Sequence, residues 1–254
     1  MSRARLYSSL VCTVFLAACG GTNGTKEEAE TPAGPPAVAD EANGATITGK
    51  VAFAGEPPAA VTIDMAANPV CARAHPTPAK TEQVVVNGNR TLRNVFVWIK
   101  SGLASPRWVA PSTPAVLSQD GCVYQPHVLG VMTGQPLEVR NNDLSNHNVH
   151  VMPQANQEWN ISQPPKGDPL VRVFTRPEVM VPVKCNVHPW MKAYVGVVAH
   201  PFFAVTGEDG TFTIKGVPPG TYTLQAWHEK YGTQELQVTV APKETKTVDF
   251  SFKG

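Results

Sequence analysis

The sequence predicts an all-β protein. From residue 44 onward, apolar residues alternate with polar ones at period two, which is the pattern of strands with one buried face. Turn residues separate these runs at short intervals, as at Asn87-Gly88, at Asp209-Gly210 and over residues 216–220. No window longer than about ten residues shows helical periodicity without a proline or glycine. Short alternating strands separated by turns indicate β-sandwiches.

The N-terminal segment has the features of a targeting signal. A basic region with Arg3 and Arg5 precedes the nearly apolar residues 10–18. This run is too short to span a bilayer, which takes about 20 residues, and it suits the apolar part of a secretory signal. Its end, Leu16-Ala17-Ala18-Cys19-Gly20, resembles a bacterial lipobox. The resemblance implies a signal peptide over residues 1–18 and lipidation of the Cys19 thiol; the alternative is an ordinary signal peptide followed by a chance cysteine.

Residues 19–43 are expected to form a lipidated, flexible linker. The stretch after Cys19 is rich in Gly, Pro, Ala, Thr and Glu and has no aromatic residue, so it buries too little apolar surface to fold. The formal charge of the whole chain is +1, which argues against a basic nucleic-acid binder. Loss of Arg3 and Arg5 with the signal peptide leaves 19 basic against 20 acidic residues, a charge of −1.

The rest of the chain supplies the strands. Ile47, Gly49, Val51 and Phe53 share one face of the first strand, whereas residues 95–99 are apolar on both faces and predict a central strand. The further alternating sets are Leu137 and Val139; Val149 and Val151; Val179, Val181 and Val183; Phe212 and Ile214; Tyr222, Leu224 and Ala226; Leu236, Val238 and Val240; and Val248, Phe250 and Phe252.

The strongest chemical signal is the segment Cys185-Asn186-Val187-His188-Pro189-Trp190-Met191, which places a thiolate, an imidazole and a thioether three residues apart. Its proline excludes a helix interior, and strands are expected on both sides, over 179–185 and 194–199. The segment is therefore expected to form a tight loop that turns all three side chains toward one point. Two His and one Cys, with a weak axial Met, are the ligand set of an electron-transfer copper site.

The second histidine of such a site has two candidates in the upstream segment, His147 and His150. His147 shares a strand face with Val149 and Val151, whereas His150 points to the opposite face. Cys185 likewise shares a face with the preceding alternate valines. If the valines mark the core face, His147 and Cys185 both point into the sandwich, and His147 is the predicted ligand.

The pattern C-x-x-H-x-x-M after a strand, with an upstream H-N-V-H, resembles the cupredoxins, the type 1 blue copper proteins of the amicyanin and plastocyanin kind. Residues 134–143 resemble the strand that leads to their first His ligand, and the resemblance covers about residues 108–199. It implies a Greek-key β-sandwich that binds one copper. It also implies that Asn148 ties the two ligand loops together, and that His188 lies near the surface as the exit for electrons. The ligands it implies are His147, Cys185, His188 and Met191.

Other interpretations of these residues remain open. Cys185 can be a disulfide partner, Met191 can be plain core, and the site can hold zinc or nothing. The stretch 152–175 departs from the family because it is longer than the roughly 12–15 residues of a plain loop, so partner specificity is not carried over.

The remaining cysteines and histidines are assigned simpler roles. Of the five cysteines, Cys12 leaves with the signal peptide, and Cys71 and Cys122 are expected to form a disulfide in an exported protein; the alternative is two free thiols. We expect His127 at the surface or on an edge strand and treat His200 and His228 as structural, with a second metal site as the alternative for all three.

The flanks of the copper segment resemble the carboxypeptidase regulatory-like domain, a small β-sandwich without catalytic activity of its own. The resemblance is carried by Asp209-Gly210-Thr211-Phe212-Thr213-Ile214 and by Gly216-Val217-Pro218-Pro219-Gly220-Thr221-Tyr222. Residues 200–254 offer too few strands for a closed core. We therefore expect residues 44–107 to supply the first part of this sandwich and 200–254 the second, with the copper domain, 108–199, inserted between them.

These assignments predict a lipid-anchored copper protein that is not an enzyme, faces the periplasm or the cell exterior, and passes single electrons to or from a redox protein such as a cytochrome or dehydrogenase. Seven histidines without a His-x-His pair are too few for a multicopper oxidase. The alternatives are a copper carrier or sensor, an adhesion or carbohydrate-contact module, and a catalytic mononuclear site in which Met191 does not coordinate.

Overall fold

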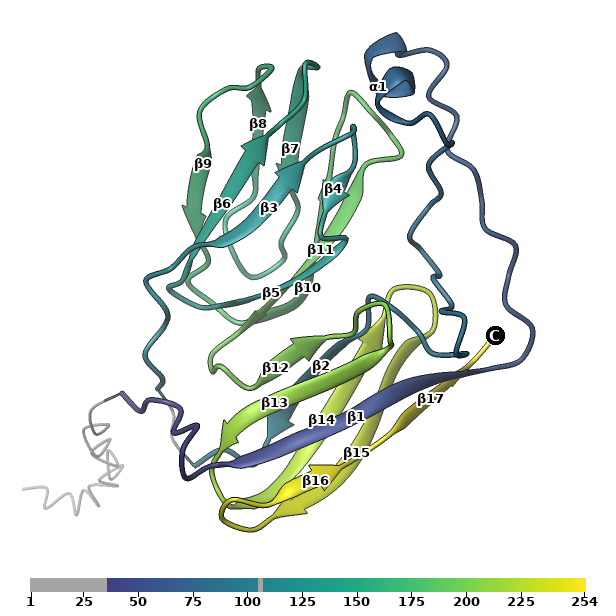
Figure 1. The fold of residues 1–254 in the computed structure, drawn as a ribbon. Coiled ribbons are helices and arrows are strands. Elements are labelled where there is room, and N and C mark those ends of the chain that lie inside the picture. Colours follow the sequence, from purple (N-terminus) through teal and green to yellow (C-terminus); the bar gives the residue numbers. More distant parts are fainter. Residues whose placement is uncertain (1–35, 105–106) are drawn as a thin grey trace, which may run out of the picture. The chain divides into compact units, whose positions relative to one another are not determined.

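The computed structural model describes residues 36–104 and 107–254 (Figure 1). This part of the chain is built from strands and one helix of six residues, so the prediction of an all-β fold is confirmed. The predicted signal peptide, Cys19 and the linker up to residue 35 lie outside the described residues. Within the described part, no helix is long and apolar enough to cross a membrane.

The last part of the predicted flexible linker makes defined contacts, which corrects that prediction for residues 36–43. The Ala37 N–H donates to the carbonyl of Arg107 at 2.9 Å, and the Val109 N–H donates to the carbonyl of Ala37 at the same distance. The Asp40 carboxylate accepts from the N–H groups of Ala42 and Asn43, which closes a turn immediately before the first strand.

Strands from both ends of the chain form one sandwich, called here the flanking sandwich. One sheet has the order β13-β1-β16, with β17 also paired to β1, and the other has the order β12-β2-β14-β15. The strands are β1 (Ala45–Ala54), β2 (Phe96–Ser101), β12 (Phe203–Val205), β13 (Thr211–Val217), β14 (Gly220–His228), β15 (Gly232–Val240), β16 (Thr245–Thr247) and β17 (Phe250–Lys253).

The intervening strands form a second sandwich, called here the central sandwich. Its sheets have the orders β5-β11-β10-β7-β8 and β4-β3-β6-β9. The strands are β3 (Ala115–Gln119), β4 (Tyr124–Gln125), β5 (Val128–Met132), β6 (Pro136–Asn141), β7 (His147–Val151), β8 (Trp159–Gln163), β9 (Leu170–Val173), β10 (Glu178–Lys184) and β11 (Lys192–Val198). The long stretch 152–175, expected to be more than a plain loop, contains β8 and β9.

Strand β2 is buried on both faces, as its apolar sequence predicts. Val97 and Ile99 lie in the core of the flanking sandwich, whereas Phe96 and Trp98 on the other face contact Val128 and Val198 of the central sandwich. A Cβ atom on Gly196 of β11 would lie 2.6 Å from the Phe96 ring, so glycine is required there for this packing. Because the chain passes from β2 into β3 and returns through β12, the central sandwich lies between two parts of the flanking one in sequence. Whether it folds as an autonomous inserted domain stays a prediction.

Two apolar positions depart from the predicted alternation. Val179 is 37 % exposed, because the pairing register of β10 and β11 shifts between Glu178 and Val181. Val181 and Val183 are buried as expected. Leu236, in β15, is 39 % exposed although Val238 and Val240 are buried. In each of these two strands, therefore, only some of the alternating apolar side chains lie in the hydrophobic core.

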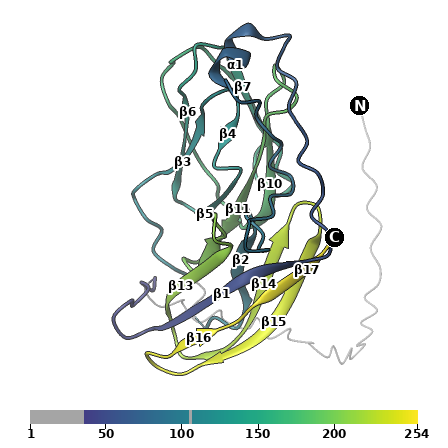
Figure 2. The same ribbon diagram turned by 45° about the vertical axis from the view of Figure 1, so that its right-hand side comes forward.

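The segment between β1 and β2 contains the short helix α1 (Pro69–Ala74), which the sequence analysis did not anticipate. Asn68 caps the helix, since its side-chain oxygen accepts from the Cys71 N–H at 3.3 Å, and Pro69 follows in the first turn, where its missing N–H costs nothing. Met65 and Cys71 belong to the hydrophobic core of the central sandwich. The part of this segment around α1, assigned from sequence to the flanking sandwich, therefore packs on the central one, with α1 at one end of it (Figure 2). The later part, with Val84, Val86 and Leu92, packs on the flanking core as expected.

Candidate metal centre

The segment 185–191 forms a closed loop between β10 and β11. The Cys185 N–H donates to the carbonyl of Met191 at 3.2 Å, and the Met191 N–H donates to the carbonyl of His188 at 3.0 Å. Cys185, His188 and Met191 are each no more than 2 % exposed. The loop therefore turns the three predicted ligands inward, toward the end of the central core.

His147 begins β7 and joins the same cluster. Its side chain is fully buried, whereas His150 lies on the other face, where its Nε2 contacts the Glu158 carboxylate at 2.7 Å. The Nδ1 atoms of His147 and His188 are 3.0 Å apart, and Cys185 Sγ is 3.8 Å from His188 Nδ1. One ligand atom from each residue lies within 4.8 Å of the others. The choice of His147 over His150 by strand parity agrees with this geometry.

Asp143 supports His147 and was not recognised from the sequence. Its Oδ2 accepts from His147 Nε2 at 2.7 Å, and its two oxygens accept from the N–H groups of Gly121 and Cys122. Burial raises the Asp143 pKa, but these donors outweigh burial and lower it. With its proton held on Nε2, His147 presents the Nδ1 lone pair to a metal. In the sequence, the one feature that could have indicated Asp143 is its position four residues before the predicted ligand His147.

Asn148 connects the two ligand-bearing segments. Its N–H donates to Cys185 Sγ at 3.3 Å, and its side-chain oxygen accepts from the Asn186 N–H at 3.2 Å. Burial alone would raise the Cys185 pKa, but the neighbouring His147 side chain and the hydrogen bond from the Asn148 N–H lower it. Burial lowers the pKa of His188, and the neighbouring His147 lowers it further. Both shifts favour the thiolate and the neutral imidazole that a metal requires.

His188 is not the exposed exit that the family resemblance implies. The residue is 1 % exposed, because the α1 segment covers its outer edge. Asn68 Nδ2 lies 2.6 Å from His188 Nε2, and Cys71 Sγ lies 3.6 Å from the same nitrogen. The Trp190 ring packs on the His188 ring with centroids 5.1 Å apart. This cover comes from a segment more than a hundred residues upstream, which lies outside the part of the chain that resembles the cupredoxins.

Cys71 and Cys122 form a disulfide, as predicted, and Cys185 is the free cysteine among the described residues. The disulfide links α1 to the loop between β3 and β4. Trp190 donates its indole N–H to the carbonyl of Cys122 at 2.9 Å, so the ligand loop is attached to the same loop. The disulfide therefore holds the α1 segment over His188.

The three histidines for which the sequence left a second metal site open, His127, His200 and His228, lie apart from this cluster. His127 is 7 % exposed, so it does not lie at the surface; it directly precedes β5, an edge strand of its sheet. Its Nδ1 contacts the Lys192 carbonyl and its Nε2 contacts the Glu229 carboxylate. His200 bonds to the carbonyl of Ile99, and buried His228 accepts from the Lys230 N–H. Within residues 36–104 and 107–254, none of the three belongs to a group of three potential metal ligands.

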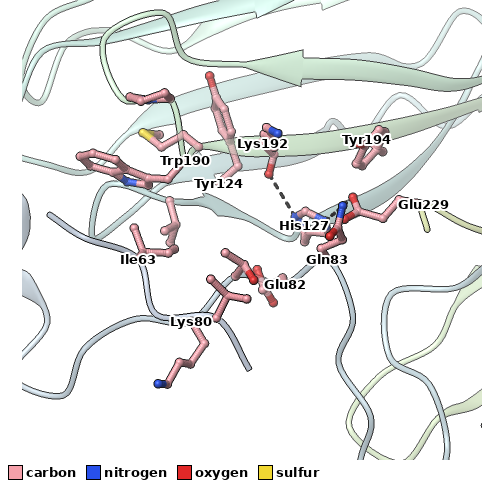
Figure 3. Close-up of a pocket in the computed structure, with 15 residues that line it drawn as sticks. Ile63, Lys80, Glu82, Gln83, Tyr124, His127, Trp190, Lys192, Tyr194 and Glu229 are labelled. Carbon is pink, nitrogen blue, oxygen red and sulfur yellow. Dashed lines mark hydrogen bonds and ion pairs between the residues drawn. The ribbon is translucent and has the colours of Figure 1, made fainter. Parts of the chain in front are cut away.

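A pocket of about 250 Å³ lies beside the ligand loop (Figure 3). Trp190 and Ile63 line one side, and His127, Tyr194 and Glu229 line the other. Burial and the neighbouring Glu229 raise the pKa of Tyr194 to about 12, so the tyrosine stays protonated at neutral pH. The Trp190 ring therefore packs on His188 and also lines this pocket.

Comparison with known proteins gives partial matches. A family model for the carboxypeptidase regulatory-like domain matches residues 189–253, and a comparison with curated protein sequences gave no match. The family match includes β11 of the central sandwich and spans β12–β17 of the flanking one, whereas β1 and β2, which complete the two sheets of the flanking sandwich, lie outside it. This part of the flanking sandwich is therefore carboxypeptidase regulatory-like.

Several solved copper proteins are similar to the chain at low identity. A Cu(I) form of an amicyanin mutant is 24 % identical, with a TM-score of 0.30 over 40 % of this chain and 97 % of that chain. A purple cupredoxin from Nitrosopumilus maritimus is 22 % identical, with a TM-score of 0.28 over 33 % and 98 %. A copper-containing nitrite reductase from Thermus scotoductus SA-01 is 21 % identical, with a TM-score of 0.32 over 38 % of this chain and only 25 % of that chain. The interpretation of the site rests on its own residues.

Proposed function

We propose that this protein binds one copper ion in a type 1 site and transfers single electrons. The observation that carries the proposal is the buried convergence of two histidine Nδ1 atoms and the Cys185 thiol, with Met191 in the same loop. Soft sulfur ligands suit Cu(I) and imidazoles suit both oxidation states. Bound copper would supply the one-electron couple; His147, Cys185 and His188 would hold it, with Met191 as a weak additional ligand.

The protein's own groups would keep this site rigid and dry. Asp143 orients the His147 ring, and the Asn148 N–H donates to the Cys185 sulfur, which is a contact that tunes such centres. Both ligand-bearing segments are joined to strands of one sheet, since β7 pairs with β10. A site held in one arrangement needs little movement when the charge of the ion changes.

The route of the electron must differ from a direct exit at His188. Asn68 and Cys71 cover the outer edge of this ring, whereas Trp190 and Asn68 are themselves half-buried. We place the contact for a redox partner at Trp190 and the α1 segment, because an electron leaving through His188 passes one of them before it reaches solvent. The partner would be a redox protein such as a cytochrome or a dehydrogenase.

Visible spectroscopy tests the copper site. Full-length protein in detergent, titrated with Cu(II), should develop the intense thiolate-to-copper band of a blue site at one copper per chain. Cys185→Ser should abolish the band because it removes the thiolate. His150→Ala is the matched control, since this histidine lies on the opposite face of β7, and it should keep the band. Retention of the band in Cys185→Ser would refute the ligand assignment.

The membrane anchor is a separate proposal. Lipidation at Cys19 would attach the protein to a bacterial membrane, with the folded part in the periplasm or outside the cell. Radiolabelled fatty acid should be incorporated into the wild-type chain and not into Cys19→Ala. Recovery of label in Cys19→Ala would contradict the proposal, and Cys12→Ala serves as a control within the predicted signal peptide.

A copper carrier or sensor is the second candidate, and the covered edge of His188 favours it. A carrier releases its ion to an acceptor, whereas an electron-transfer protein keeps it through repeated oxidation and reduction. Cycles of chemical oxidation and reduction beside a competing chelator separate the two. Retained copper and reversible colour support electron transfer, whereas loss of copper on reduction, or bleaching with oxidation of Cys185, supports the carrier.

A further inference from the structure

A second group of potential ligands lies on the other side of His188. Its Nδ1 faces His147 and Cys185, whereas its Nε2 faces the Cys71–Cys122 disulfide, with Cys71 Sγ at 3.6 Å. One ligand atom each from Cys71, Cys122 and His188 lies within 4.8 Å of the others, and all three residues are buried. The imidazole therefore stands between two sulfur-containing sets, one on each of its ring nitrogens.

The spacing of this second group suits three-coordinate binding. With thiolate and imidazole ligands at about 2.3 and 2.0 Å from an ion, a trigonal arrangement separates sulfur from nitrogen by about 3.7 Å. The Cys71 Sγ to His188 Nε2 distance of 3.6 Å agrees with this value. Two thiolates and one imidazole are soft donors, which favour Cu(I) over harder cations.

We propose that reduction of the Cys71–Cys122 disulfide creates a Cu(I) site formed by these two thiolates and His188 Nε2. A dithiol reductant would break the S–S bond and reduce the two cysteines to thiols. The dithiol itself would be oxidised to a disulfide in the same exchange. Cu(I) then binds both sulfurs with release of two protons, and copper does not change oxidation state. Because both sulfurs are buried, the reductant reaches them when the α1 segment lifts.

The new site competes with the first one. A neutral imidazole has one in-plane lone pair, so His188 ligates through one nitrogen at a time. Asn68 Nδ2 contacts the same Nε2 at 2.6 Å and has to be displaced by the ion. Reduction of the disulfide thus offers copper a ligand set on the opposite side of the ring. This inference does not depend on the proposed electron transfer, because it concerns different sulfurs.

Cu(I) titration in the absence of the first thiolate tests the inference. Full-length Cys185→Ser protein would be titrated anaerobically with Cu(I) against a chromophoric Cu(I) chelator, once with the disulfide intact and once after reduction by a phosphine. We expect one tightly bound Cu(I) per chain after reduction and none before it. X-ray absorption of the reduced form should show two sulfur ligands and one nitrogen ligand.

Matched variants in the same Cys185→Ser background separate a site from simple thiol binding. Cys71→Ser with Cys122→Ser should lose the binding, His188→Ala should lose the nitrogen ligand, and Asn68→Ala should raise the affinity because it removes the group that competes for Nε2. Circular dichroism confirms that each variant is folded, and a thiol assay confirms complete reduction. Equal Cu(I) binding before and after reduction, or binding that survives in the double serine variant, would overturn the inference.

Discussion

The flanking and central sandwiches each place histidines in their interiors, and the partners of these rings differ. In the flanking sandwich, His228 accepts from the Lys230 N–H and His200 contacts the Ile99 carbonyl, so backbone groups satisfy both rings. In the central sandwich, His147 and His188 turn their Nδ1 atoms toward each other and toward Cys185. Burial is common to both regions, whereas convergence of lone pairs is a property of the central one.

The central sandwich holds the Cys71–Cys122 disulfide, whose partners are 51 residues apart, and the flanking sandwich has no disulfide among the described residues. Cys71→Ala with Cys122→Ala should lower the free energy of unfolding by about 4 kcal/mol, since the unfolded chain regains the entropy of an open loop. Urea unfolding measures this change. Trp190 fluorescence should also change, because the loop that contains Cys122, to which Trp190 is hydrogen-bonded, is no longer held by the disulfide. An unchanged unfolding midpoint would contradict the role given to the disulfide.

A core truncation in the flanking sandwich should separate stability from metal binding. Leu224 is fully buried in the flanking core, so Leu224→Ala should cost about 3 kcal/mol of unfolding free energy. The affinity for copper, measured by chelator competition, should stay the same because no ligand lies in that core. Val195→Ala is the counterpart in the central core. A loss of copper affinity in Leu224→Ala would mean that the two sandwiches depend on each other.

The buried His228 ring of the flanking sandwich, which is hydrogen-bonded to the backbone, should make the stability of the protein depend on pH. Burial is the main cause that lowers the His228 pKa to about 4; His127 and Lys230 also act to lower it, and the neighbouring Glu229 acts to raise it. Because the folded pKa lies below the ordinary value of about 6.5, the unfolded chain binds the proton first, and stability falls as pH falls from about 6.5 toward 4. The loss attributable to His228 between pH 7 and 5 is roughly 2 kcal/mol. Urea unfolding of His228→Gln should show a correspondingly flatter profile, and equal slopes would exclude this cause.

Asp143 orients a predicted ligand, which no described carboxylate of the flanking sandwich does. Asp143→Ala should weaken copper binding about tenfold, because His147 loses the acceptor that holds its ring orientation and its Nε2 proton. Chelator competition measures the affinity. Asp209→Ala is the matched control in the flanking sandwich, where the carboxylate accepts from Thr211 in a turn, and it should leave the affinity unchanged. Equal affinities of Asp143→Ala and the wild type would assign Asp143 to loop structure alone.

Alternation of apolar and polar residues correctly predicted those strands that have one face buried in a core and the other face exposed. The runs around Val51, Val139 and Phe212 lie in strands whose apolar side chains form the two cores. Strand β9 was not predicted because most of its side chains are exposed, so no periodic signal distinguishes it from a loop. Helix α1, at six residues, is too short to show a period of 3.6 and is held by its cap and the disulfide.

For the candidate site, residue types and spacing were sufficient to identify His147, Cys185, His188 and Met191, because local strand parity and a short loop fix where those side chains point. The disulfide partners also followed by elimination, once the chain was expected to be exported and the other cysteines had been given roles. Asp143, Asn68 and the burial of His188 did not follow. Asp143 acts through contacts inside the central sandwich, with His147 four residues away and with Gly121 and Cys122 in the β3–β4 loop. Asn68 and the burial of His188 depend on a contact between residues 120 positions apart, which forms only when the segment around α1 packs on the central sandwich. Local sequence specifies which side chains can bind a metal, whereas long-range packing specifies which ring nitrogens are oriented, covered or left available.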